Sequence, residues 1–216
     1  MTVTEQRSEI APARRPRRGN RRRSAGTGVT GVIAGLAMLA AAVLLQTKAL
    51  GEGAMSDPLS YTGTKGEAVD ARRFTVRLDS FTTAKKIQTS DTETIETGNL
   101  FLIVRASAKS SMKPYHLGQP VLLTDDGKRF AATDRVDSQQ TLANKWVQPD
   151  IWVGGLSFFE IPPSALPGAR VVFKLPPQAG PQEPYRPEVE IDLGLDEAGA
   201  RKLADSPQDV YSIVKK

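Results

Sequence analysis

The hydrophobic pattern of this chain begins with one long uncharged run that shows no alternation. Residues 24–47 carry no charge, residues 29–45 form the apolar body of the run, and Lys48 closes it. Because a helix rises about 1.5 Å per residue, a run of this length is about enough to cross the hydrocarbon core of a bilayer. The pattern therefore predicts a transmembrane helix over residues 24–50.

Arginines directly before this run predict its orientation. Residues 1–23 hold eight arginines against Glu5 and Glu9, and such basic flanks stay on the cytoplasmic side of a membrane. We therefore expect residues 1–23 to form a disordered cytoplasmic tail that faces the anionic headgroups of the lipid bilayer. Everything after Lys48 is expected on the extracytoplasmic side of the cell membrane.

A cleaved export signal is the alternative to this signal anchor. The apolar part of a cleaved signal runs about 7–15 residues and ends at a pair of small residues. Here the apolar body is longer, and Thr47 and Ala49 make a poor cleavage pair. We favour the uncleaved anchor. Cleavage near Leu50 would instead release a secreted β-sandwich protein that binds an external ligand.

After the run, the pattern changes first to a spacer and then to a period of two. Residues 51–66 are rich in Gly, Ser, Thr and Pro and are predicted to be a flexible linker. Residues 74–79 then alternate apolar and polar side chains, which is typical of a half-buried strand. Residues 100–108 are almost continuously apolar, as expected for a central strand covered on both faces. The polar segment 89–99 between them is expected to be a long loop or a hairpin.

Further strand signals follow at short intervals. Residues 121–124 lead through Asp126 and Gly127 into residues 129–130, which predicts a hairpin because glycine tolerates the positive φ of a tight turn. Three more strands are expected over residues 151–161, 171–175 and 189–193. At least seven short strands separated by turn signals predict a mainly β protein with an antiparallel β-sandwich over residues 67–195.

The segment 196–216 is predicted to close the chain with two short helices. Asp196 is a candidate N-cap for a helix over residues 197–204. Ser206 and Pro207 repeat this capping pattern for a second helix, whose apolar residues would pack on the sandwich. A docking peptide for a partner is the alternative interpretation of the last turn.

Charge and cysteine content narrow the possible partners. The formal net charge is +5, but residues 1–23 alone carry +6 and the remaining chain −1. No aromatic residue lies between the arginines of the tail to stack on bases, so we expect no nucleic acid partner. The chain has no cysteine, so an exported domain must be stable without disulfides and a lipid-modified cysteine is excluded.

Three motifs in this order resemble the DUF4352 group of bacterial exported domains, which have a telokin-like immunoglobulin fold. They are a Gly-led apolar strand over residues 97–104, a Leu-x-Asp-x-Gly-x-x-Phe hairpin within residues 122–130, and a Pro-led turn followed by Gly-x-Leu-x-Phe-x-x-x-Pro within residues 148–162. The resemblance covers residues from about 67 to 193. Lys109 stands where the family often has Asn, and Asp150 stands where its turn usually has Gly. The resemblance implies an immunoglobulin-like sandwich that is exposed in the cell envelope, is not an enzyme, and is tethered by a lipid or a helix.

Candidate catalytic and metal-ligating residues are sparse. His116 is the only histidine, so a zinc site would need carboxylate or water ligands at the other positions. No Gly-x-Ser-x-Gly motif is present to form a nucleophile elbow. The acidic residues near Asp91 and at Asp125 lack the spacing of a calcium loop. We therefore expect no enzymatic activity, no cofactor and no metal; an enzyme using His116 is the less favoured alternative.

Aromatic residues are the better candidates for recognition, because Trp and Tyr concentrate binding energy at interfaces. Tyr115 and Trp146 are expected in loops that share one surface and bind a partner, whereas Trp152 is expected in the core. Gly31 and Gly35 form a G-x-x-x-G spacing that permits close contact with another transmembrane helix. The sequence thus predicts a single-pass, non-catalytic binding or accessory module for an envelope protein complex, such as a transporter or a cell-wall complex.

Overall fold

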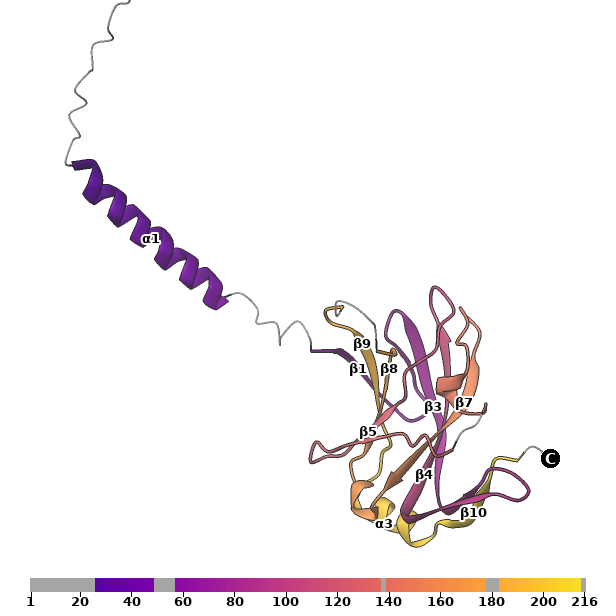
Figure 1. The fold of residues 1–216 in the computed structure, drawn as a ribbon. Helices are drawn as coiled ribbons and strands as arrows, with labels where there is room; N and C mark the ends of the chain where they lie inside the picture. The colour runs from indigo at the N-terminus through magenta and orange to yellow at the C-terminus, as the bar shows by residue number, and fades with distance from the viewer. Residues whose placement is uncertain (1–25, 49–56, 137–138, 178–182, 215–216) are drawn as a thin grey trace, which may run out of the picture. The chain divides into compact units, whose positions relative to one another are not determined.

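The computed structural model describes residues 26–48, 57–136, 139–177 and 183–214. Helix α1 spans Gly26–Lys48 and belongs to a unit separate from the β-domain (Figure 1). Among the described residues, whose side chains in α1 are those of residues 31–44, no helix is both long enough and apolar enough to cross a membrane.

Several sequence predictions fall outside the described part of the chain. The predicted cytoplasmic tail over residues 1–23 lies there entirely. So do residues 24–25 and 49–50 at the two ends of the predicted anchor, and most of the predicted linker. They remain predictions from the sequence.

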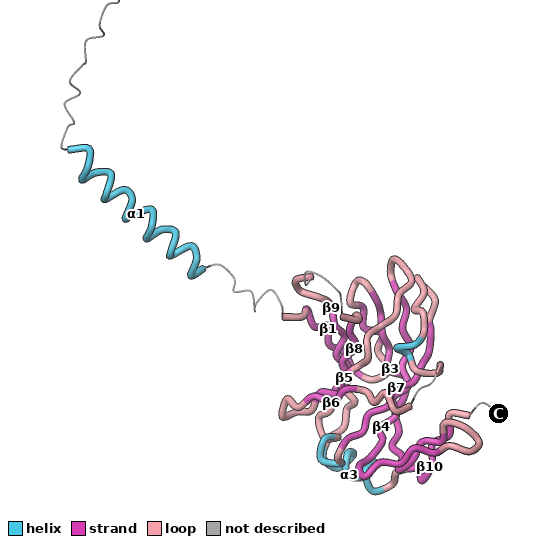
Figure 2. Tube along the Cα trace, in the orientation of Figure 1, coloured by secondary structure: helices cyan, strands magenta, loops and turns pink. Residues whose placement is uncertain are grey.

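The described β-domain consists of two sheets (Figure 2). One sheet has the strand order β1-β9-β8-β5-β6, and the other has the order β10-β3-β4-β7 with β2 also paired to β3. The strands are β1 (Leu59–Thr64), β2 (Ala68–Asp70), β3 (Phe74–Gln88), β4 (Thr94–Ser110), β5 (Val121–Leu123), β6 (Arg129–Ala131), β7 (Val153–Ile161), β8 (Arg170–Lys174), β9 (Pro187–Asp192) and β10 (Gln208–Ser212). Two 3₁₀ turns, η1 (Leu142–Asn144) and η2 (Pro163–Ala165), and helix α3 (Glu197–Asp205) complete it.

Strand β4 is buried on both of its faces, as its continuous apolar sequence predicts. Leu102 and Val104 belong to the main core between the two sheets, together with Leu122, Val171 and other buried residues of the opposite sheet. The alternate residues of β4 lie on the other face of its sheet and belong to a second apolar cluster. Its buried members are Ala84, Ile87, Phe101, Ile103, Val136, Leu156, Phe158 and Ile213. The β-sandwich fold class is therefore confirmed, with a second core outside it.

Local predictions near the turns also hold. The polar segment after β3 is a hairpin, in which β3 ends at Gln88 and β4 begins at Thr94. Gly127 has φ +80° in the turn between β5 and β6, a backbone conformation that glycine adopts without strain. The Asp196 side chain caps α3, because it accepts a hydrogen bond from the backbone N–H of Gly199 at 2.7 Å.

Two predicted boundaries are wrong. The predicted linker contains β1, which pairs in parallel with β9 and packs Tyr61 against the main core. The predicted second C-terminal helix is instead β10, which pairs in parallel with residues 84–88 of β3. In both cases a short segment with a weak local pattern takes the strand conformation because the edge of an existing sheet offers it backbone hydrogen bonds.

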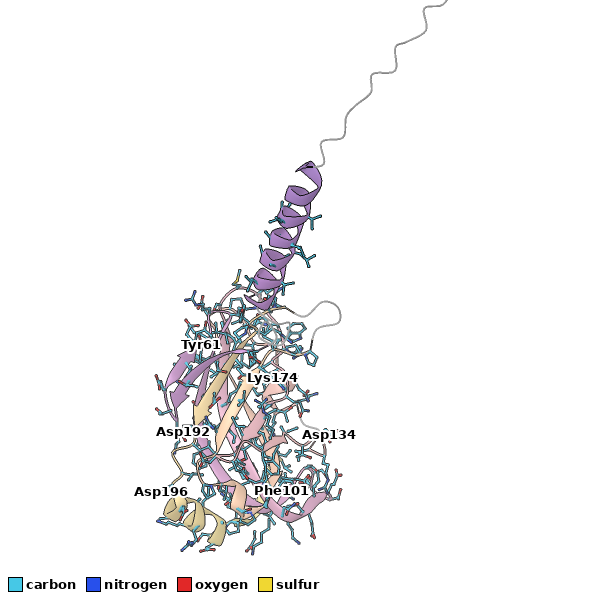
Figure 3. The ribbon with its side chains drawn as sticks, turned by 90° about the vertical axis from the view of Figure 1, so that its left-hand side faces the viewer. Tyr61, Phe101, Asp134, Lys174, Asp192 and Asp196 are labelled. Carbon is cyan, nitrogen blue, oxygen red and sulfur yellow. The ribbon has the colours of Figure 1, made fainter. Side chains whose placement is uncertain are left out.

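The strand pairings define two opposite ends of the sandwich (Figure 3). β1 begins at Leu59, beside the first residue of β9, and β8 ends nearby at Lys174. In the other sheet, Phe74 at the start of β3 pairs with Ser110 at the end of β4. An ion pair of 2.7 Å between Arg73 and Glu183 joins the segments that precede β3 and β9. All these positions therefore lie at one end.

We call this end the β1 end. Its described segments are residues 57–59, 70–73, 109–118, 145–152, 174–177 and 183–187. At the opposite end, which we call the α3 end, lie the β3–β4 turn, the β5–β6 turn, residues 162–169 and the chain from residue 192 to residue 207. Figure 3 labels Tyr61 and Lys174 toward the β1 end, and Asp192 and Asp196 toward the α3 end.

Gly155 fixes the approach of η1 to β7 and so positions the chain that follows η1. A Cβ on Gly155 would lie 2.5 Å from Cα of Leu142 and 2.6 Å from its backbone N. A Cβ on the neighbouring Gly154 would meet Oγ of Ser107 at 3.5 Å, an ordinary contact. Only the first site is closed to a methyl group.

We predict that Gly155→Ala lowers the free energy of unfolding by about 1–3 kcal/mol, because the backbone of Leu142 must move. Gly154→Ala is the matched control and is expected to be neutral or to stabilise by about 0.5 kcal/mol, since alanine restricts the unfolded chain. Urea unfolding followed by tryptophan fluorescence measures both. Equal effects of the two substitutions would contradict the close approach.

Candidate functional site

Two segments of the β1 end are joined by backbone hydrogen bonds. Tyr115 and Val147 exchange both of their backbone bonds, at 3.2 and 2.9 Å. The backbone N–H of Ser110 donates to the carbonyl of Gln148 at 2.9 Å. Tyr115 therefore pairs with Val147, the residue after Trp146, so the two candidate binding residues lie on neighbouring segments.

Of Tyr115 and Trp146, Trp146 is the one exposed to solvent. Its side chain is 57% exposed, and its ring centroid lies 4.2 Å from that of His116 at an angle of 48°. Nδ1 of His116 lies 3.2 Å from the carbonyl oxygen of Ala143, so the tautomer protonated on Nδ1 donates a hydrogen bond there. This bond holds the imidazole, and the imidazole supports one side of the exposed indole ring.

Tyr115 has a different role, because its hydroxyl is engaged inside the loop structure. The side chain is half-buried against the main core, and its hydroxyl donates to the backbone carbonyl of Arg73. Burial raises the pKa of Tyr115 to about 12, with the Arg73 guanidinium acting in the opposite direction. Tyr115 thus fastens the 109–118 segment to the start of β3 and positions the loops around Trp146.

Trp152 does not lie in the core, contrary to the sequence prediction. It precedes β7 and is 39% exposed. The Arg77 guanidinium lies 5.1 Å and the Lys109 ammonium 5.7 Å from its ring centroid. Both cations belong to the outer face of the β3–β4 pair, so Trp152 covers that face and is held by cation–π contacts. The sequence could not indicate which face a tryptophan at a strand terminus takes.

The turn before Trp152 depends on a left-handed residue. Asp150 has φ +56°, in the region that favours glycine. Its carboxylate lies 3.3 Å from Nζ of Lys109, and its backbone N–H donates to the carbonyl of Ser110 at 3.1 Å. The turn places Ile151 at the surface, where its side chain is 61% exposed.

Sequence reasoning missed four other exposed apolar residues of the β1 end. They are Leu59, Met112, Ile151 and Tyr185, of which Met112 is the most exposed at 81%. The available signal was the placement of large apolar side chains inside polar loop sequences, as at Met112 between Ser111 and Lys113. The strand pattern does not account for apolar residues at such positions.

The acidic candidates lie in turns and ion pairs. Asp126 makes an ion pair of 2.8 Å with Lys128, and hydrogen bonds from Lys128 and Thr124 lower the pKa of Asp126 to about 2. Glu93 accepts a hydrogen bond of 3.0 Å from the Thr89 hydroxyl. Within the described ranges, no group of three or more His, Cys, Asp or Glu side chains is arranged to hold a metal ion.

The remaining candidate positions are a cleft beside β7 and two glycines on α1. A cleft of about 310 Å³ beside β7 is lined mainly by apolar and hydroxyl side chains, with Asp134 as its one carboxylate among the described residues. On α1, a Cβ added at Gly31 or Gly35 would meet no atom within 4 Å.

Comparisons with known proteins do not assign the chain to a family. No family model matches the chain, and no curated protein matches it. Among solved structures, the yjhA protein from Bacillus subtilis is similar at 13% identity and a TM-score of 0.48, over 60% of this chain and 98% of that one. An uncharacterized β-sandwich protein from Clostridium difficile is similar at 8% identity and a TM-score of 0.40, over 63% of this chain and 95% of that one. Both scores lie below 0.5, so the fold assignment rests on the strand pairing itself.

The Tyr115 hydroxyl makes a testable contribution to stability. Tyr115→Phe removes this hydroxyl and is expected to lower the free energy of unfolding by about 1 kcal/mol at neutral pH. The folded pKa of about 12 lies above the ordinary value of about 10. The contribution is therefore fully present below pH 10 and is lost as the pH rises through 12. Urea unfolding of both proteins from about pH 8 to 12 measures this difference, and a difference that grows above pH 10 would contradict the assignment.

Proposed function

We propose that this chain is a single-pass, membrane-anchored module that displays an immunoglobulin-like sandwich on the extracytoplasmic side of the cell envelope. Its function is binding, as a non-catalytic or accessory subunit of an envelope complex. The observation that carries the binding function is the exposed indole of Trp146, supported by His116 at a ring distance of 4.2 Å. An exposed tryptophan held rigidly on a folded scaffold is typical of a contact surface.

The anchor is supported by the sequence around α1. Residues 24–47 have no charged side chain, and the chain from Gly26 to Lys48 is one helix. The arginine cluster before it favours a cytoplasmic N-terminus. The finer family assignment, a DUF4352-like domain, is supported by two features. The motif over residues 122–130 forms the β5–β6 hairpin, and Asp150 takes the left-handed conformation where that family has glycine.

The anchor predicts that the full-length chain stays in the membrane after alkaline extraction. Introducing two charges with Leu36→Arg and Leu39→Arg is expected to release the chain, because each arginine costs about 2.5–3.5 kcal/mol at the centre of a span. Membrane fractionation with intact-mass measurement tests both points. A wild-type chain that begins near Leu50 and is recovered outside the membrane would support the secreted alternative instead.

The binding function predicts that Trp146 is needed for contacts in the envelope. Trp146→Ala is expected to reduce the crosslinking of the full-length chain to envelope components on the order of tenfold, because hot-spot tryptophans contribute this much at interfaces. Val210→Ala is the matched control, since Val210 is 46% exposed on β10 and lies outside the β1 end. Mass spectrometry of the crosslinked protein and lipid adducts provides the readout. Equal loss in both variants would count against a surface centred on Trp146.

A further inference from the structure

The exposed apolar side chains of the sandwich are gathered at one end. Among its described residues, seven large apolar side chains are exposed, and six of them belong to the β1 end. These six are Leu59, Met112, Trp146, Ile151, Trp152 and Tyr185. The seventh, Val210, lies on β10 near the β3–β4 turn. A scattered surface apolar residue needs no explanation, but a set confined to one end of a domain does.

Charged residues are also distributed unequally between the two ends of the sandwich. The described segments of the β1 end contain seven lysines or arginines against four aspartates or glutamates. The corresponding segments of the α3 end contain three basic residues against eight acidic ones. Two of the basic residues of the β1 end, Arg72 and Lys113, are exposed and make no ion pair with a described residue. The β1 end is therefore apolar and basic at once.

The chain also connects the β1 end to α1. Residues 49–58 join Lys48 to Leu59, and ten residues reach at most about 35 Å when fully extended. If α1 is in a bilayer, Leu59 is within that distance of the lipid surface. The face that carries the exposed aromatic and basic residues is the face where this connection arrives.

We propose that the β1 end docks on the headgroup region of an anionic phospholipid bilayer. Trp146, Trp152 and Tyr185 enter the interface, where tryptophan and tyrosine are enriched because their rings are apolar at one end and polar at the other. Arg72 and Lys113 contact the phosphate groups. The inference rests on the proposed anchoring by α1 and names lipid as the partner of the surface around Trp146.

The arrangement of the six side chains favours a bilayer over a protein partner. They come from four separate segments of the β1 end, and each of these segments also contains charged or polar residues. A planar bilayer surface can meet the tips of several loops together, whereas a protein hot spot is one closely packed cluster. The contact can also be weak, because a short tether keeps the effective concentration of the surface in the mM range.

Intrinsic fluorescence isolates this surface, because the chain has two tryptophans and both belong to it. The full-length chain is incorporated into nanodiscs of brominated phosphatidylglycerol or brominated phosphatidylcholine. With the anionic lipid we expect quenching of tryptophan fluorescence on the order of half, since interfacial side chains lie about 5–10 Å deep. Quenching with phosphatidylcholine is expected to be at most a third of this value, because the attraction to the basic residues is absent.

Charge reversal provides the matched pair of variants. Lys113→Glu is expected to reduce quenching by phosphatidylglycerol at least twofold. Lys202→Glu, which changes an exposed lysine of α3 at the opposite end, is expected to leave it unchanged. Trp146→Phe and Trp152→Phe then assign the quenched signal to each indole. Both substitutions replace exposed rings, so the β-sandwich is expected to keep its circular dichroism spectrum.

The outcomes separate the docking from the anchor. A chain that does not migrate with the nanodisc overturns the proposed anchor. A chain that migrates with the disc but shows no quenching, or equal quenching by both lipids, overturns the docking alone. In native membranes, a photoreactive residue at position 112 shows whether the β1 end contacts lipid or a protein. Lipid adducts support the inference, and a protein adduct without lipid adducts overturns it in favour of a protein partner.

Discussion

The structure depends on the burial of β4 on both of its faces. This strand pairs with β3 on one side and with β7 on the other. Leu102 and Val104 complete the core between the sheets, and Phe101 and Ile103 complete the second cluster. Because the side chains of a strand alternate, a slip of one residue would exchange the two sets and leave both clusters mismatched. The registers of β3 and β7, and through them the position of every loop at the β1 end, follow from this strand.

The loops around Trp146 are held by backbone contacts in addition to apolar packing. The paired segments of Tyr115 and Val147, the left-handed Asp150 and the close approach of η1 to Gly155 each fix the path of the chain. Leu117 and Val147 are buried in the main core and Tyr115 packs against it, and other side chains of these loops, such as Trp146, face outward. Stability and surface chemistry are thus separated in space, with the apolar clusters inside and the aromatic and basic residues at one end.

The sequence predicts a large part of this fold and a smaller part of the site. The strongest predictions concern features with a local cause, namely the apolar run of β4, the glycine of the β5–β6 turn and the Asp196 cap of α3. The proximity of Tyr115 and Trp146 was expected from the clustering of sandwich loops, but their different roles were not. Trp152 was misplaced, because its exposure depends on Arg77 and Lys109 from two other strands.

By itself, the sequence determined the uncharged run with its arginine cluster, the sandwich class and the main strands, since each of these leaves a periodic or compositional pattern along the chain. Only the tertiary structure decided that β1 and β10 are strands, because each is stabilised by the edge of a sheet formed by residues far away in the sequence. It also decided that the exposed apolar and basic residues meet at one end. They lie on separate loops, and nothing along the chain records which loops the strand order brings together.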